Sequence, residues 1–205
     1  MPRIEPLAPP YSAEIEQALS RWMPPDVAHA PLVLFRLLHR HPQLASRMRV
    51  LGAGLVAHGE LPDLDREIVI ARVCARSDCR YEWGVHAAVF APKVGLTREH
   101  LQATVSGDAN IPLWSPRHST LIQAVDELHD TARLSEQTWD GLRTHYRTAQ
   151  LLEFLVLAGW YRTISYVANG LLIEDEPWAA PYPDKVAGTA TGARAPIGDD
   201  SAPNV

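Results

Sequence analysis

The chain has 205 residues, 46% of them apolar, which is enough for one domain with a sizeable buried core and short extensions. With 19 Lys and Arg against 24 Asp and Glu, the net charge is −5, and no dense basic block is present. These features argue against nucleic-acid binding and against a basic membrane-binding face. No apolar stretch reaches the roughly 18 residues of a membrane span. The first 11 residues lack a secretory signal and only two cysteines occur, so we expect a cytoplasmic protein.

Apolar residues recur at helical spacing in the first half of the chain, and they predict helices over 13–22, 32–41, 43–58, 63–76 and 79–93. Repeated prolines interrupt residues 1–25, which we expect to form an N-terminal arm around the first helix. Asp63 is expected to cap the fourth helix, and Gly95 to end the fifth in a turn.

The second half continues in the same way, with helices predicted over 97–105, 115–130, 135–146 and 148–172. Thr97, Ser115 and Ser135 are expected to cap the first three. Because strand-like alternation is absent, the fold class is all-α. We expect one helical domain over 26–180, followed by a flexible tail over 181–205 that is rich in Pro, Ala, Gly and Asp.

A carboxylate stands on an apolar face of the helix predicted over 63–76. Ile70, Ala71 and Cys74 follow Glu67 at three, four and seven residues, so all four share one stripe. A carboxylate there is partly desolvated, which suits a proton carrier. The alternative is a capping or salt-bridging Glu in the first helical turn, where negative charge is favoured.

The next helix carries a thiol, a carboxylate and an imidazole on one face, because Cys79, Glu82 and His86 are spaced i, i+3 and i+7. Such groups can exchange protons, and His86 and the helix N-terminus could favour the thiolate of Cys79. The alternative is a buried, inert Cys next to a Glu–His pair on the surface.

The spacing of these four residues resembles the motif of the alkylhydroperoxidase/carboxymuconolactone decarboxylase superfamily. Its peroxidase members carry Glu, eleven residues, Cys, two residues, Cys, three residues and His; here Glu82 stands at the second Cys. The resemblance covers 31–178 and extends to the segments "LPDLDREIVIARVCARSDCRYEWGVH", "WSPRHSTLIQAVDELHD" and "LAGWYRTISYVANGLLIEDEPWA". It implies an AhpD-like helical domain that forms homo-oligomers (dimers, trimers or hexamers), and the N-terminal arm and 178–182 could wrap a partner subunit.

The Cys-to-Glu departure affects the predicted reaction. A two-thiol peroxidase needs a resolving thiol, which Glu82 cannot supply; Cys74 could supply it, although a core position is the favoured interpretation. The remaining catalytic set, Glu67, Glu82 and His86 with Cys79 lining the pocket, is suited to acid–base chemistry.

We therefore expect a cofactor-free lyase-type enzyme that decarboxylates or isomerises a small carbonyl or lactone compound. The alternatives are a thiol-dependent peroxidase that uses Cys79, and a non-catalytic helical oligomer that binds a small ligand.

Four further residues are candidates for substrate binding: Tyr81, Trp83, Arg162 and Tyr166. Arg162 could bind a substrate carboxylate or pair with an acidic residue, and Trp83 also reads as a core residue. The pair Glu82 and His86, with Glu67 nearby, resembles a carboxylate-bundle ligand set, but the paired Glu-x-x-His signatures are absent, so no metal is expected. The expected partners are a small-molecule substrate and further copies of the chain, with neither nucleic acid nor membrane.

Overall fold

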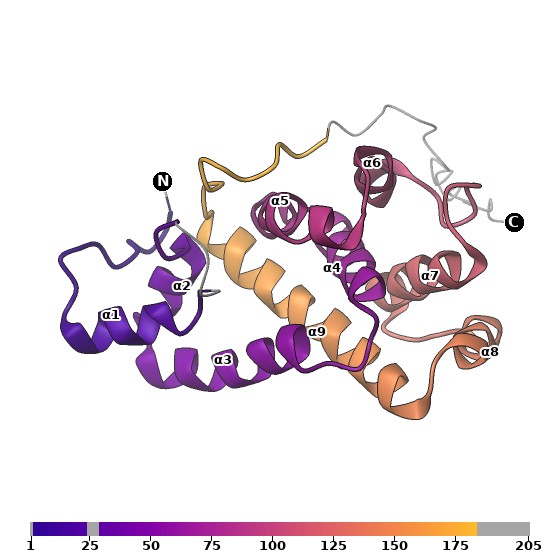
Figure 1. Cartoon of the computed structure of the whole chain (residues 1–205), viewed down its shortest axis with the longest axis horizontal. Coiled ribbons are helices and arrows are strands. Elements are labelled where there is room, and N and C mark those ends of the chain that lie inside the picture. Colours follow the sequence, from indigo (N-terminus) through magenta and orange to yellow (C-terminus); the bar gives the residue numbers. More distant parts are fainter. Residues whose placement is uncertain (1, 24–28, 184–205) are drawn as a thin grey trace, which may run out of the picture.

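The computed structural model describes residues 2–23 and 29–183, and every regular element in these ranges is helical (Figure 1), as predicted. The α-helices are α1 (Ala13–Ser20), α2 (Val33–Leu38), α3 (Pro42–Ala57), α4 (Asp63–Arg76), α5 (Arg80–Val89), α6 (Arg98–Ser106), α7 (Pro116–Thr131), α8 (Glu136–His145) and α9 (Thr148–Leu171), and η1 (Ala91–Val94) is a short 3-10 helix. The predicted tail lies outside the described residues from position 184 onward. None of the helices in the described ranges combines the length and the apolarity needed to cross a bilayer.

Most helix ends follow the capping residues of the sequence. The side chains of Thr97, Ser115 and Ser135 each accept a backbone N–H in the first turn of their helix, as predicted. The prediction for Asp63 is wrong by one position: Pro62 is the N-cap, and Asp63 accepts a hydrogen bond from Arg66 at 2.8 Å instead.

The helix predicted over 79–93 is shorter than expected. It ends at Val89, and the chain continues as the 3-10 helix η1 because Pro92 has no N–H to extend an α-helical ladder. Gly95 then ends this segment with a φ of 77°, the left-handed turn that the sequence predicts.

Helix α4 is the centre of the molecule and packs against α5, α6, α7 and α9 (Figure 1). Its residues 65–75 are all buried, charged ones included. A helix that is buried on every side must pair each of its charged groups with a partner inside the fold. This is why Glu67 lies in the interior instead of on a solvated first turn.

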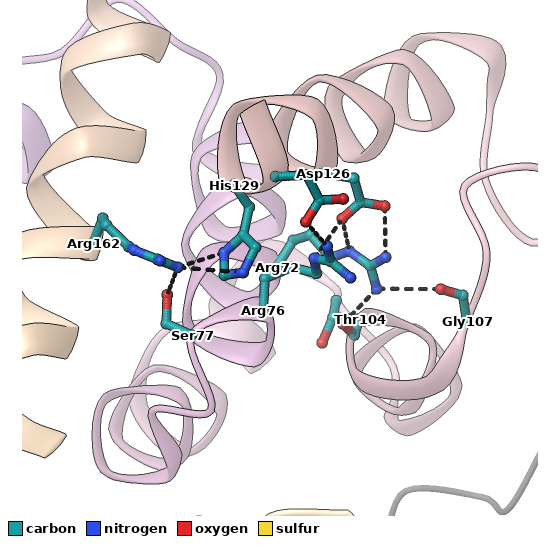
Figure 2. A network of polar contacts seen from close by, with 9 residues as sticks. Arg72, Arg76, Ser77, Thr104, Gly107, Asp126, His129 and Arg162 are labelled. Carbon is teal, nitrogen blue, oxygen red and sulfur yellow. Dashed lines mark hydrogen bonds and ion pairs between the residues drawn. The ribbon is translucent and has the colours of Figure 1, made fainter. Parts of the chain in front are cut away.

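Two of these buried charges hold neighbouring helices to α4. Asp65, fully buried, accepts hydrogen bonds from Arg117 at 2.5 Å, from Tyr146 at 2.8 Å and from the His118 ring at 3.1 Å. Arg72 donates two hydrogen bonds to Asp126, at 2.6 and 2.7 Å, and two more to the carbonyls of Thr104 and Gly107 (Figure 2). Both groups are therefore satisfied by structure and are not free for chemistry.

The segment after α9, residues 173–183, runs back along α5 and is called the C-terminal strap here (Figure 1). Its Glu176 accepts hydrogen bonds from the Tyr81 hydroxyl at 2.6 Å and from the Val33 amide at 2.7 Å. The Ala180 amide donates to the Gly84 carbonyl at 3.0 Å, and a Cβ on Gly84 would lie only 2.9 Å from the Ala180 oxygen. The segment expected to wrap a partner thus packs on its own chain.

Candidate active site

Glu67 of α4 and His86 of α5 form a buried pair, joined by a hydrogen bond of 2.7 Å between Glu67 Oε2 and His86 Nδ1. The two residues are 1% and 5% exposed. Burial opposes the charged form of His86, but the charge and the hydrogen bond of Glu67 outweigh it and raise the pKa of His86 above its ordinary value. The carboxylate also fixes the tautomer, since Nδ1 must carry the proton that it donates to Glu67.

The other ring nitrogen of His86 faces two further groups. The Tyr161 hydroxyl of α9 lies 3.0 Å from Nε2, and Glu82 Oε1 lies 3.7 Å from it. Burial raises the pKa of Glu82, the charges of Glu67 and Glu176 raise it further, and His86 opposes them. Within the described part of the chain, the second oxygen of Glu82 is buried without a hydrogen-bond partner. A buried, unsatisfied carboxyl oxygen of this kind is suited to a bound molecule.

These groups open on a cavity of about 250 Å³. Glu82, His86 and Tyr161 are part of its lining, together with the side chains of Arg21 and Arg49. The remaining wall is apolar, and five of its side chains are aromatic: Trp22, Phe35, Phe90, Trp160 and Trp178. An apolar cavity with a few convergent polar groups is the usual form of a small-molecule site.

Cys79, also a predicted site residue, is the N-cap of α5 and is fully buried, but it is not part of the cavity lining. Cys79 and Cys74 are both free thiols. The interaction with Cys74 lowers the pKa of Cys79 although burial opposes it, whereas burial and the neighbouring Cys79 raise the pKa of Cys74 well above its usual range. Cys79 is therefore the more nucleophilic of the two.

The structure brings together Glu67, Glu82 and His86, but it places the four residues predicted to bind substrate elsewhere. The Tyr81 hydroxyl bonds Glu176 of the strap and the Leu34 amide, and the Trp83 ring donates to Thr104 at 3.1 Å. Neither residue is part of the cavity lining, and both join α5 to other segments of the chain.

Arg162 and Tyr166 lie on the opposite face of α9 from the cavity. Arg162 donates to Tyr166 at 2.9 Å and to Ser77 at 3.1 Å, and it contacts the His129 ring (Figure 2). Tyr166 is 63% exposed. The neighbouring Tyr161, which sequence reasoning did not place in the site, is the residue of α9 that reaches His86. Arg162 instead lines a second cavity, together with Val73 and His129.

Among the described residues, no group of three or more His, Cys, Asp or Glu side chains is arranged to hold a metal ion.

Solved structures with the same helical fold share little sequence with this chain. An uncharacterised peroxidase-related protein from Silicibacter sp. TM1040 has a TM-score of 0.75 at 13% identity, over 89% of this chain and 96% of that chain. A protein of unknown function from Agrobacterium tumefaciens, suggested to be the antioxidant defence protein AhpD, has a TM-score of 0.62 at 14% identity, over 68% and 95%. The debrominase Bmp8, as a cysteine-to-alanine variant in complex with 2,3,4-tribromopyrrole, has a TM-score of 0.68 at 12% identity, over 84% and 91%. At these identities the likeness shows the fold alone.

A search of curated proteins found no match. The family model described as "Carboxymuconolactone decarboxylase family" matches residues 42–127. The matched segment runs from the start of α3 into α7 and includes Glu67, Cys79, Glu82 and His86. The match and the AhpD-like fold agree with the motif resemblance of the sequence, and the central segment of the chain is similar to the carboxymuconolactone decarboxylase family.

Proposed function

We propose that the protein is an acid–base enzyme that moves a proton next to a carbonyl group of a small, mostly apolar carbonyl or lactone compound, by decarboxylation, isomerisation or a related step. One observation carries the proposal: His86, paired with Glu67, and the carboxyl group of Glu82 meet at the wall of a single, mostly apolar cavity. Two titratable groups in different environments, both beside a bound molecule, are suited to act as an acid and a base.

In the proposed reaction, Glu82 as a carboxylate removes a proton from the carbon beside the carbonyl. His86, charged and held by Glu67, stabilises the enolate that forms, and Tyr161 offers its hydroxyl beside it. His86 Nε2 or Glu82 then returns a proton to carbon. In a decarboxylation, loss of CO₂ leaves the same enolate, and only the protonation step is needed.

The walls of the cavity support a ligand of this kind. Five aromatic rings favour a flat, apolar body, and the cavity volume of about 250 Å³ limits its size. Arg21 and Arg49 add positive charge at the wall, which favours a ligand with a carboxylate or an enolate oxygen.

Proton transfer can be tested without knowing the substrate. A panel of small carbonyl compounds and carboxylated lactones is incubated with the protein in D₂O, and NMR follows deuterium uptake at the carbon beside the carbonyl and loss of carboxylate. We expect catalysed exchange or decarboxylation with at least one member of the panel. His86→Gln should lower the rate about 10²-fold or more, the usual contribution of a general acid or base.

The matched control is His145→Gln, because His145 is an exposed residue of α8 outside the cavity lining. This variant should keep the full rate. If His86→Gln exchanged protons as fast as the control, the assignment would be wrong. Binding of panel members without any exchange or decarboxylation would support a ligand-binding protein instead.

A thiol-dependent peroxidase is the second candidate, and the lowered pKa of Cys79 favours it. Its test is the consumption of hydrogen peroxide in the presence of an external thiol. A rate that disappears in Cys79→Ser would support this function, whereas equal rates in the wild type and the variant would exclude it.

A further inference from the structure

The end of α4 places two thiols against each other through a specific backbone turn. The Cys79 amide donates to the Cys74 carbonyl at 2.9 Å, and the Asp78 amide donates to the Ala75 carbonyl at 3.2 Å. Asp78 between them has a φ of 52°. These two bonds around a left-handed residue form a Schellman motif, in which the side chains at both ends of the turn commonly contact each other. Here those two side chains are Cys74 and Cys79.

The backbone hydrogen bond limits how far apart the two cysteines can be. A Cα lies about 1.5 Å from its own nitrogen and about 2.4 Å from its own carbonyl oxygen. With 2.9 Å between the Cys79 nitrogen and the Cys74 oxygen, the two Cα atoms are at most about 6.8 Å apart, within the range of a disulfide. Both thiols are free and fully buried.

We propose that Cys74 and Cys79 form a reversible disulfide that joins the end of α4 to the start of α5. This goes beyond the acid–base function and does not depend on it. The motif residue at position 82 is a glutamate, so the thiol partner of Cys79 comes from five residues upstream instead of three residues downstream. The disulfide would join the two helices that carry Glu67 and His86.

The oxidant of the two thiols is a hydroperoxide. The Cys79 thiolate attacks one peroxide oxygen, the O–O bond breaks, and the released oxyanion takes up the proton that the thiol lost. Cys79 is then a sulfenic acid. Cys74 loses its proton and attacks the Cys79 sulfur, the S–O bond breaks, and water leaves. Two thiols and hydrogen peroxide give one disulfide and two waters, and a dithiol reverses the oxidation by thiol–disulfide exchange.

The sequence provides a direct measurement. Trypsin cleaves after Arg72, Arg76 and Arg80, so Cys74 and Cys79 fall in the separate peptides 73–76 and 77–80. The folded protein is treated with hydrogen peroxide, chosen because it is small enough to reach buried thiols, and is then unfolded in the presence of an alkylating agent and digested without reduction. We expect the two peptides to be joined, with a mass lower by two hydrogens than their sum. Dithiothreitol should separate them.

Two variants complete the test. In Cys74→Ser, Cys79 should stop at the sulfenic acid and be labelled by dimedone. In Cys79→Ser, Cys74 should stay unmodified at the same peroxide dose. Circular dichroism before treatment checks that both variants are folded. The proposal is overturned if wild-type Cys79 is labelled by dimedone as fully as in Cys74→Ser, if both thiols stay reduced, or if the linked peptides come from two chains joined in a dimer.

Discussion

His86 is held at both ring nitrogens by buried groups from three helices, and its ionisation depends on which of them dominates. Burial alone would lower its pKa, and Glu67, 2.7 Å from Nδ1, reverses the direction. The imidazole therefore stays charged to a higher pH than a free histidine does. This balance can be measured without a substrate.

We expect Glu67→Gln to lower the pKa of His86 below its ordinary value, because an amide keeps the shape but removes the charge that opposes burial. NMR titration of the His86 ring would show a value above the ordinary one in the wild type and below it in the variant. Glu136→Gln, on the exposed first turn of α8, is the control and should leave the His86 titration unchanged. A His86 pKa that is equal in all three proteins would contradict the assigned balance.

Glu82 makes stability depend on pH. Burial raises its pKa in the folded state above the ordinary 4.5. The folded protein thus binds this proton more tightly than the unfolded chain does. The resulting stabilisation is complete below pH 4.5 and is lost as the pH rises through the folded-state pKa.

We expect Glu82→Gln to lose less stability than the wild type as the pH rises above 4.5. As the pH rises, the Tm of the variant should increase relative to that of the wild type, by about 2–4 °C for each kcal/mol of unfolding free energy that only the wild type loses. Thermal melts between pH 4 and pH 8 test this, with Glu136→Gln as the control that should follow the wild type. Parallel Tm curves for wild type and Glu82→Gln would contradict it.

Helix positions could largely be predicted from the sequence, because apolar spacing and capping hydroxyls act locally. The faces of α4 and α5 were predictable for the same reason, so Glu67 and His86 were found. The contribution of α9 was not, because only tertiary packing decides that Tyr161 turns to His86 while Arg162 turns to Ser77 and His129. A buried Tyr among apolar residues was the one signal available for Tyr161.

The joint around Asp65 connects α4, α7 and the residue after α8. Burial acts to raise the pKa of Asp65, but hydrogen bonds from His118, Arg117 and Tyr146 outweigh it and lower the pKa below its ordinary value of 3.8. This joint therefore contributes stability above pH 3.8, which is lost as the pH falls through the lower folded-state pKa.

We expect Asp65→Asn to destabilise the fold by about 3 kcal/mol or more, because Arg117, the His118 ring and the Tyr146 hydroxyl lose their charged acceptor in the interior. The Tm at pH 7 should fall by roughly 10 °C. The further decrease in Tm between pH 7 and pH 3 should be smaller in the variant than in the wild type. Thermal melts at pH 7 and pH 3 measure both effects. The control is Asp140→Asn, which removes an exposed ion pair with Arg143 and should change the Tm by no more than about 1 °C. An equal decrease in Tm in both variants would contradict the role of Asp65.

On the scale of the whole molecule, both ends of the described chain contribute to the cavity. Trp22 follows α1, and Trp178 lies in the C-terminal strap. The Trp178 ring stacks on the His29 ring, with 4.4 Å between the ring centroids. Glu176 fixes the strap to α2 and α5 through Val33 and Tyr81. Assembly into oligomers stays a prediction of the sequence.

We expect Glu176→Ala to release the strap, because two donors lose their buried acceptor at a cost of about 1–3 kcal/mol. The Val33 amide should then exchange with solvent about tenfold faster or more, and acrylamide should quench tryptophan fluorescence more strongly. Hydrogen exchange and quenching are measured beside Asp175→Ala, an exposed neighbour, which should behave like the wild type. Unchanged exchange at Val33 in Glu176→Ala would show that other contacts hold the strap.

Three of the groups proposed to handle the proton and the three tryptophans of the cavity wall come from different parts of the chain. Glu67, Glu82 and His86 lie within residues 42–127, whereas Trp22, Trp160 and Trp178 lie outside this range. The two sets can therefore diverge separately: substitutions in the flanks could change which molecule is accepted while the proposed proton-transfer groups stay intact. Exchanging the segments outside 42–127 between relatives would then change which ligand is bound while the proposed proton-transfer groups are kept.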